Sequence, residues 1–377
     1  MWCEDCESID EYYFDETTFW IYVPTTDAFG KLAHMCGING YAATPENSHC
    51  ISLTIGRERI EKFLLQLAGT LEPPTLAKSK IITAPAGEQL QPDQFGKVLP
   101  ADVFIHRHKS SWIIEAIDNQ RYESWFQPIV YADSKPGELR TFAHEALFRA
   151  FDQDQNLMSP ALIFSMAHSS ELLFSVDLAA RRSAVECAAK AGINSKVFIN
   201  FNPSSIYDPA YCLRSTATAI ADLGFKPSDI VFEITETHRV TDMAHLRGIL
   251  AFYRNAGFGV ALDDVGSGWS GLNMLKDVRP DYVKIDMDLV QHIDSDPLKQ
   301  SIVEHLIQIA RDNSIRVIAE GIERAEEHRM LVDMGADYLQ GFYFAKPKKL
   351  PNTVSKQVED QISNSTKPLK DAAKAFR

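Results

Sequence analysis

The chain has 377 residues, of which 45% are hydrophobic and 24% are charged, a composition typical of a globular protein with one large or two smaller domains. The formal net charge of −13 argues against binding to polymeric nucleic acid, which requires a basic face. No apolar run reaches the roughly 18 residues of a membrane span. The acidic start MWCEDCESIDEYYFDE lacks the basic region of a signal peptide. We therefore expect a cytoplasmic protein.

Four of the six cysteines lie in the first fifty residues. They are Cys3, Cys6, Cys36 and Cys50, with His34 and His49 beside the last two, while Cys187 and Cys212 are isolated. In a reducing cytoplasm, structural disulfides are not expected. The CEDC segment has the two-residue gap of a zinc half-site, and the HMC and HC segments offer further ligands. The alternative is that Cys36 and Cys50 are small buried apolar residues, and the sequence leaves both interpretations open.

Residues 1–110 carry mixed patterns that predict a small α/β domain. FWIYVP indicates a strand, and GRERIEKFLLQLAGTL has the periodicity of an amphipathic helix. The stretch EPPTLAKSKIITAPAGEQLQPDQFGKVLP is typical either of a linker or of a loop-rich part of that domain. SSWIIEAIDNQ then predicts a connecting helix within residues 111–123.

From residue 124 onwards, strand-like runs alternate with helical patterns such as DLAARRSAVECAAKAG. The eight runs are FQPIVYA, FAHEALFRA, KVFINFNP, DIVFEITE, FGVALDDVG, DYVKIDMD, IRVIAEGIE and YLQGFYFAKP. This alternation predicts a parallel sheet, and eight units over residues 124–352 fit a (β/α)8 barrel of about 250 residues. An open doubly wound sheet also fits the pattern. Residues 353–377 read as a C-terminal tail.

Polar side chains recur where the apolar runs end. They are Asn200, Asn202, Glu233, Glu236, Asp263, Asp264, Lys284, Asp286, Glu320, Glu323 and Gln340. In a barrel the C-terminal strand ends meet at one mouth, where clustered carboxylates repel one another unless cations hold them. We therefore expect a site for Mg²⁺ or Mn²⁺. Asp263 and Asp264 are expected to point to different sides of their strand end and so to serve two ions, as in phosphodiester hydrolysis.

The segment TFAHEALFRAF, residues 141–151, extends this pattern. Side chains two apart on a strand share a face, so Glu145, Leu147 and Arg149 would point one way and Ala146 and Phe148 the other. A carboxylate and a guanidinium would then face the same side as the other polar strand ends.

Several of these motifs together resemble the EAL-domain family of cyclic di-GMP phosphodiesterases, named for the Glu-Ala-Leu at residues 145–147. The motifs are FQPIV, EALFR, FINFN, FEITET, DDVGSGWS, DYVKID, AEGIE and QGFYFAKP, which occur in this order over residues ~121–350. The resemblance implies an α/β fold with a modified TIM (β/α)8 barrel whose first strand runs antiparallel to the others. Val265 and Trp269 stand where the family more often has Phe and Tyr.

The resemblance also implies roles for individual residues. It gives Glu145, Asn200, Glu233 and Asp263 as metal ligands, with Asp264 on a second metal, and Glu145, Lys284 and Glu320 as catalytic. Lys284 would contact the attacking water, and Glu320 would act as general base. Gln127, Leu147, Arg149 and Gln340 would bind substrate or organise the site, and Glu236 and Glu323 would hold the loop after Asp264.

The implied reaction is hydrolysis of cyclic di-GMP to linear pGpG with two Mg²⁺ or Mn²⁺ ions per barrel, within bacterial second-messenger signalling that includes biofilm control. The resemblance also implies a homodimer through the barrel, and the position of residues 1–110 ahead of it suggests a regulatory or dimer-forming role. One alternative is a non-catalytic cyclic di-GMP receptor, although such proteins typically lose a metal ligand and none is missing here. The other is a nicotinamide-dependent oxidoreductase, because GSGWSG at residues 266–271 fits G-x-G-x-x-G. The two aspartates just before that segment would repel a pyrophosphate.

Overall fold

The structure is a computed structural model that describes residues 12–133, 140–206, 209–235, 243–267 and 271–349. Within these ranges the chain divides into two compact units. One contains residues 122–150 together with those from 177 onwards, and the other contains the residues up to 121 together with 151–176. The segment 151–176 thus groups with the N-terminal residues, whereas the predicted domains placed it in the barrel. The predicted bounds themselves stay a prediction.

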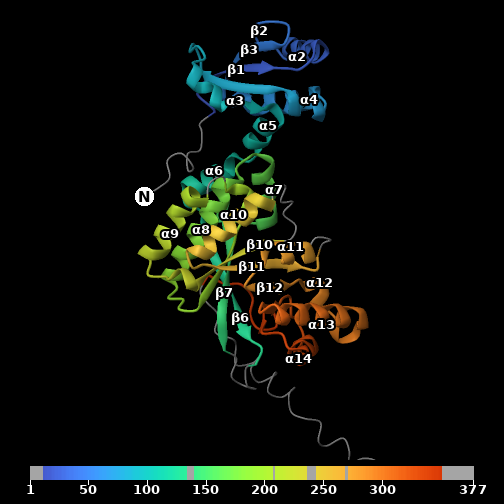
Figure 1. The fold of residues 1–377 in the computed structure, drawn as a ribbon. Helices are drawn as coiled ribbons and strands as arrows, with labels where there is room; N and C mark the ends of the chain where they lie inside the picture. Colours follow the sequence, from blue (N-terminus) through green and yellow to red (C-terminus); the bar gives the residue numbers. More distant parts are fainter. Residues whose placement is uncertain (1–11, 134–139, 207–208, 236–242, 268–270, 350–377) are drawn as a thin grey trace, which may run out of the picture. The chain divides into compact units, whose positions relative to one another are not determined.

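The unit that contains the N-terminal residues is built on a small antiparallel sheet. Its elements are β1 (Glu16–Tyr22), α2 (Thr26–Ile38), β2 (Ala43–Pro45), β3 (Cys50–Gly56), α3 (Arg57–Thr70), α4 (Pro73–Lys78), β4 (Lys80–Pro85), the 3₁₀ turn η1 (Pro92–Lys97), β5 (Leu99–Pro100), α5 (Ala101–Lys109), α6 (Ser111–Asp118), β8 (Leu157–Met158) and α7 (Pro160–Ser169). The five-stranded sheet has the order β2-β3-β1-β4-β5 (Figure 1).

The core of this unit forms between the sheet and the helices. Phe19 and Ile21 of β1 are fully buried against Phe63 of α3 and Leu32 of α2, and the period-3.6 spacing of the apolar residues gives each helix one such face. Residues 72–100, for which the sequence allows a linker or a part of the domain, belong to the domain, because their strand β4 pairs with β1 in the sheet. Its Ile81 is buried in the same core.

The second unit contains the remaining elements. They are β6 (Tyr122–Tyr131), β7 (Thr141–Phe151), α8 (Leu173–Lys190), β9 (Lys196–Asn200), η2 (Pro203–Ser205), α9 (Pro209–Asp222), η3 (Pro227–Asp229), β10 (Ile230–Thr235), α10 (Met243–Asn255), β11 (Gly259–Val265), α11 (Gly271–Val278), β12 (Tyr282–Ile285), α12 (Met287–Val290), η4 (Ile293–Ser295), α13 (Pro297–Asp312), β13 (Arg316–Ala319), α14 (Ala325–Met334) and β14 (Tyr338–Leu339).

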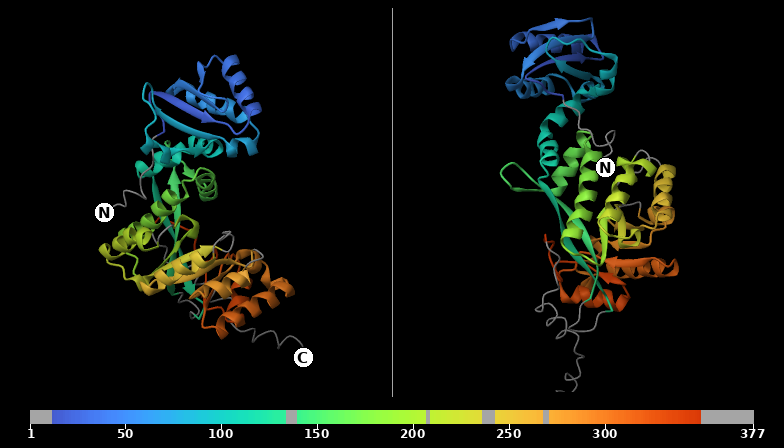
Figure 2. Two further views of the ribbon diagram at one scale, coloured as in Figure 1. Left: turned by 45° about the horizontal axis from the view of Figure 1, so that its top comes forward. Right: turned by 90° about the vertical axis from the view of Figure 1, so that its left-hand side faces the viewer.

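Its strands form a closed eight-stranded barrel. Their order is β6-β14-β13-β12-β11-β10-β9-β7, and the pairing of β6 with β7 closes the sheet. The strands from β7 to β14 run parallel in this order, while β6 is antiparallel to both of its neighbours. The long strands β6 and β7 lie side by side in Figure 2, with helices packed around the barrel. The predicted barrel and its antiparallel first strand are confirmed.

One end of the barrel is filled by aromatic side chains near the starts of the strands. Phe142 stacks on Tyr338 with ring centroids 3.8 Å apart, and the Tyr282 ring packs edge-on against Phe198. These rings lie against a buried apolar cluster that includes Ile129 and Ile318. Since this end is closed by apolar packing, polar side chains at the other strand ends can form a site. In the part of the chain that the structure describes, no helix is both long and apolar enough to cross a bilayer.

Two glycines let the loops at the polar end approach one another closely. Gly321 has φ +69°, and a Cβ there would lie 2.3 Å from Cβ of Met287. A Cβ on Gly341 would lie only 2.0 Å from the carbonyl oxygen of Ile322. The backbone of the loop after β13 is therefore packed between these neighbours with no room for a side chain.

We predict that Gly341→Ala destabilises the protein by about 1–3 kcal/mol or more, because the backbone of Ile322 must move. Urea unfolding would measure it. The control is Gly248→Ala in the exposed face of α10, where a Cβ meets nothing within 4 Å and helix propensity should add about 0.5–1 kcal/mol of stability. Equal midpoints for the two variants would contradict the packing argument.

Candidate active site

A buried lysine at the polar end of the barrel lies among four carboxylates. Lys284 of β12 is 1% exposed, and the acids come from β7, β10 and β11 and from the residue that follows β13. Its Nζ lies 2.6 Å from Oε1 of Glu320, 2.8 Å from Oε1 of Glu233, 3.0 Å from Oδ1 of Asp263 and 3.5 Å from Oε2 of Glu145. The strand register contributes to this convergence. Glu233 lies opposite Asn200 on β9 and opposite Ala261 on β11, two residues before Asp263.

The charges in this cluster do not balance. Burial alone would lower the pKa of Lys284, but Asp263, Glu145, Glu233 and Glu320 raise it well above its usual value, so the side chain is an ammonium. Burial raises the pKa of Glu233 and of Glu320, and the lysine only partly opposes this. A lysine has three N–H donors, which cannot satisfy four carboxylates.

Several carboxylate oxygens accordingly lack hydrogen-bond partners among the described residues. They are both oxygens of Glu233, Oδ1 of Asp263 and Oε1 of Glu320. Three of these atoms nevertheless form ion pairs with the Lys284 ammonium at 2.6 to 3.0 Å and so share a single cation, whereas Oε2 of Glu233 has no partner among the described residues. Buried anionic oxygens without donors are costly, and a divalent cation that prefers oxygen ligands would satisfy them. The donor set therefore fits Mg²⁺ or Mn²⁺.

The end of β11 brings two adjacent aspartates into one group. The register with β12 shifts between Leu262 and Val265, and Asp264 adopts a left-handed conformation with φ 57°. Such a bulge re-aims side chains that would otherwise alternate. Carboxylate oxygens of Asp263, Asp264 and Glu320 lie within 4.8 Å of one another, a spacing that could hold a metal ion. The expectation that the two aspartates serve two ions stays a prediction.

Glu145 is held by amide side chains. Asn200 donates from Nδ2 to Oε1 of Glu145 at 3.2 Å, and Gln340 donates from Nε2 to Oε2 at 2.6 Å. Gln127, opposite Glu145 in the β6–β7 ladder, accepts from Gln340 at 3.4 Å and donates to the carbonyl of Ala345. Four of the predicted site residues thus form one frame that fixes the carboxylate.

The next two predicted positions on β7 lie further along the same face. Leu147 pairs with Trp125 of β6, and the Arg149 guanidinium lies over the Trp125 ring, 5.3 Å from its centroid. Burial lowers the pKa of Arg149, although Glu145 opposes this. The half-buried guanidinium donates to the carbonyl of Phe148.

Other predicted residues lie away from this cluster or outside the described residues. Glu236, Cys3 and Cys6 fall in the undescribed part of the chain. The side chain of Glu323 is exposed, while its backbone N–H is bound by Glu327. Cys36 is buried in the core of the sheet unit, as the apolar alternative expects, and no support for a zinc site comes from it.

Two further carboxylates lie near the site, of which only Asp286 was among the polar residues expected at the strand ends. Asp286 hydrogen-bonds to Asp264 and caps α12. Asp177 of α8 accepts from the backbone N–H of Asn202 and from the side chains of Ser205 and Arg181, and so fixes the loop that follows Asn200. The spacing of Asp177 and Arg181 by four residues on a helix was the available signal.

Comparison with known proteins identifies the family. The EAL domain model matches residues 111–347. This chain belongs to the EAL-domain family. It is 31% identical over 243 residues to the probable cyclic di-GMP phosphodiesterase PdeG of Escherichia coli, covering 62% of this chain and 46% of that one. It is 27% identical over 242 residues to the cyclic di-GMP phosphodiesterase RocR of Pseudomonas aeruginosa, covering 62% and 59%. The chain thus spans less than two thirds of the length of these relatives.

Solved EAL structures resemble the barrel. A standalone EAL protein from Vibrio cholerae in a c-di-GMP-bound form is 35% identical, with a TM-score of 0.57, covering 63% of this chain and 97% of that one. The manganese and cyclic di-GMP complex of BlrP1 from Klebsiella pneumoniae covers 88% of this chain and 96% of that one, with a TM-score of 0.54. At 22% identity it shows the fold alone. The family match includes residues 266–271, so the nicotinamide alternative for this EAL segment is not retained.

We predict that the metal-free EAL protein loses stability as pH rises from 4 through 7. Burial, with Asp263 and Asp286, raises the pKa of Asp264 from 3.8 to about 7, so the folded state binds a proton that the unfolded state has released. Stability then falls with rising pH, by less than the roughly 1.4 kcal/mol per pH unit of a fully shielded group, because solvent screens the partly exposed Asp264. Urea titrations from pH 5 to 8 with chelator, in wild type and Asp264→Asn, would measure this. The variant should show a shallower pH dependence, and parallel profiles would contradict the assignment.

Proposed function

We propose that the protein hydrolyses one phosphodiester bond of cyclic di-GMP to give linear pGpG. The observation that carries this proposal is the buried cluster in which four carboxylates face one ammonium with oxygens left unsatisfied. Membership of the EAL family and the similarity to the cyclic di-GMP phosphodiesterase RocR support the substrate. The full set of acidic side chains favours an enzyme over a non-catalytic receptor.

The roles proposed for single residues come from the resemblance to the EAL family, and the geometry of the cluster supports them. Glu145, Asn200, Glu233 and Asp263 would hold one Mg²⁺ or Mn²⁺ ion, and Asp264 would bind the second, a proposal supported by the proximity of Asp263, Asp264 and Glu320. When bound, the ions would supply charge neutralisation and a lowered pKa for water. Lys284 would donate a hydrogen bond that orients the attacking water. Glu320, whose Oε1 lies 2.6 Å from Nζ of Lys284, would accept the proton of the attacking water.

The substrate would be placed by groups on β6, β7 and β14. The Arg149 guanidinium is suited to a phosphate oxygen, because its planar donors bind such groups in a bidentate manner. Leu147 offers an apolar contact on the same face of β7, while Gln127 and Gln340 would fix Glu145 rather than touch the reacting atoms. The regulatory role of residues 1–110 stays a prediction.

We predict that the purified protein converts cyclic di-GMP to pGpG with Mg²⁺ or Mn²⁺, and that Glu320→Gln lowers kcat by at least about 10²-fold through loss of the base. Chromatography of the products would measure both. Glu304→Gln on the exposed face of α13 is the matched control and should retain full activity. Tight binding of cyclic di-GMP without product would move the assignment to a receptor.

We also propose that the protein forms a homodimer through the barrel unit. Leu272 of α11 is 61% exposed and lines a cavity of about 500 Å³ together with Leu275, Ile309 and Ile315. The lining also contains Lys276, Arg279 and Asn313, and of its aliphatic side chains Leu272 and Ile309 are the exposed ones. We propose this mixed surface as the interface, because exposed aliphatic side chains that lie together are typical of interaction sites.

We predict that Leu272→Glu converts the dimer to monomer, because a charge cannot be buried unpaired in an apolar interface. Light scattering after size-exclusion chromatography would measure the mass. Leu65→Glu serves as the comparison, since Leu65 is 54% exposed on α3 of the other unit. Dissociation by Leu65→Glu alone would place the interface on that unit instead, and a monomeric wild type would refute the proposal.

A further inference from the structure

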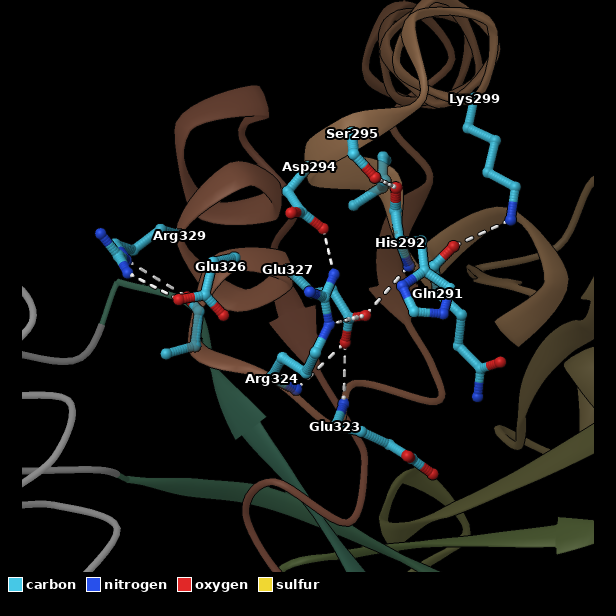
Figure 3. Close-up of polar contacts among 12 residues, drawn as sticks. Gln291, His292, Asp294, Ser295, Lys299, Glu323, Arg324, Glu326, Glu327 and Arg329 are labelled. Carbon is cyan, nitrogen blue, oxygen red and sulfur yellow. Dashed lines mark hydrogen bonds and ion pairs between the residues drawn. The ribbon is translucent and has the colours of Figure 1, made fainter.

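A buried glutamate outside the acidic cluster ties two loops of the barrel unit together. Glu327 on the first turn of α14 is 1% exposed. Its Oε2 accepts from the backbone N–H groups of Glu323 at 3.0 Å and Arg324 at 3.1 Å, while Oε1 accepts from the backbone N–H of His292 at 3.0 Å (Figure 3). Burial alone would raise the pKa of Glu327, but these bonds lower it below its usual value.

Part of this arrangement is an ordinary helix cap, and part is not. A glutamate that accepts from the backbone three residues earlier completes a capping box, as Glu327 does with Arg324. The bond from His292 serves no helix end of α14, because His292 precedes η4 in a left-handed conformation with φ 60°. The Arg324 side chain adds a second link between the same segments, since it donates to Glu327 at 2.9 Å and pairs with Asp294.

The two linked segments lead directly from the candidate active site. The segment 320–324 begins with Glu320, whose backbone N–H donates to the carbonyl of Ile285, next to Lys284. The segment 291–294 follows α12, whose cap Asp286 touches Asp264. Glu327 therefore holds the two loops that carry Glu320 and that follow Asp286, the hydrogen-bond partner of Asp264.

We propose that Glu327 is a positioning residue that holds the loop after β13 against the loop after α12, and thereby sets the place of the Glu320 carboxylate for metal binding. The inference rests on the proposed function, in which Glu320 faces a divalent cation. Partners that orient metal ligands typically change metal affinity by 10–100-fold when mutated.

Glu327→Gln separates the cap from the link between loops. Glutamine at this position can still complete a capping box through its one carbonyl oxygen. It cannot also accept from His292 and the Arg324 guanidinium, because its second polar group is a donor. Glu326→Gln is the matched control, since Glu326 is the preceding residue of α14 and forms an exposed ion pair with Arg329 at 3.3 Å. Figure 3 shows this ion pair and the contacts of Glu327.

The first measurement is amide hydrogen exchange of the full chain with chelator present, which requires neither metal nor activity. In Glu327→Gln, peptides covering residues 288–295 and 319–325 should exchange faster than in wild type, while the barrel strands and the Glu326→Gln control remain unchanged. Unchanged exchange in both peptides would overturn the link itself.

The second measurement is titration calorimetry with Mn²⁺ alone, without substrate. Glu327→Gln should weaken the Kd for Mn²⁺ by at least roughly tenfold, and Glu326→Gln should leave it unchanged. Because affinity is measured on folded molecules, a mere loss of stability would not produce this shift. An unchanged Kd would overturn the positioning role.

A second variant covers the case in which Glu327→Gln does not fold. Arg324→Gln removes the other link while keeping the backbone N–H that caps α14, and the side chain is 37% exposed, so folding should survive. It should weaken Mn²⁺ binding in the same direction, by at least roughly threefold, and no change would count against the inference. A wild type that binds Mn²⁺ yet hydrolyses nothing would defeat the proposed function and leave the inference standing; a wild type that binds none would overturn both.

Discussion

The excess of buried negative charge around Lys284 is the constraint on which the rest of the EAL barrel depends. One ammonium cannot neutralise four carboxylates, and their desolvation opposes folding when no cation is bound. The barrel must therefore draw its stability from elsewhere. It does so at the opposite end, where Phe142, Tyr282 and Tyr338 pack among fully buried aliphatic side chains. Stability and chemistry are thus separated along the strands, as is general in barrels of this class.

The charge excess also explains the uncharged groups that surround the acids. Glu145 is fixed by amides from Asn200 and Gln340, which restrain the carboxylate without adding a positive charge that would compete with a cation. The loops behind the site are fixed in a similar manner by backbone donors to Glu327. Close packing at Gly321 and Gly341 then leaves Glu320 little freedom. A metal ligand held in advance loses less entropy when the ion binds.

Much of the barrel and its site could be predicted, because the signals are local. Apolar runs that end in acids, such as FEITE and ALDD, mark the strand ends at which Glu233 and Asp263 lie. The irregularity at the end of β11 could not be predicted, because it appears only in the register between β11 and β12, whose residues are paired by the fold and not by a local motif. The sequence does not identify strand β4, because the prolines and glycines around IITAP indicate a loop and its pairing partner β1 is distant in sequence.

The role of Glu327 could not be predicted from the sequence for a different reason. On the sequence it is one of two adjacent glutamates at the start of a helix, and nothing local tells which is buried. Only tertiary contact with His292 and Glu323 separates it from its exposed neighbour. Residues that act at the site through their side chains end strands in recognisable motifs, whereas residues that act by holding other residues have no fixed motif.

Under the proposed function, the same charge excess couples metal and substrate. A cyclic dinucleotide carries two phosphate anions, and a cluster of four carboxylates would repel it, with the Arg149 guanidinium as partial compensation. A bound divalent cation changes the sign of that interaction, so each ligand must favour the other to the same extent, because coupling free energies are reciprocal. An acidic protein with a net charge of −13 can therefore bind an anionic substrate, provided that bound divalent cations lie between the carboxylates and the phosphates.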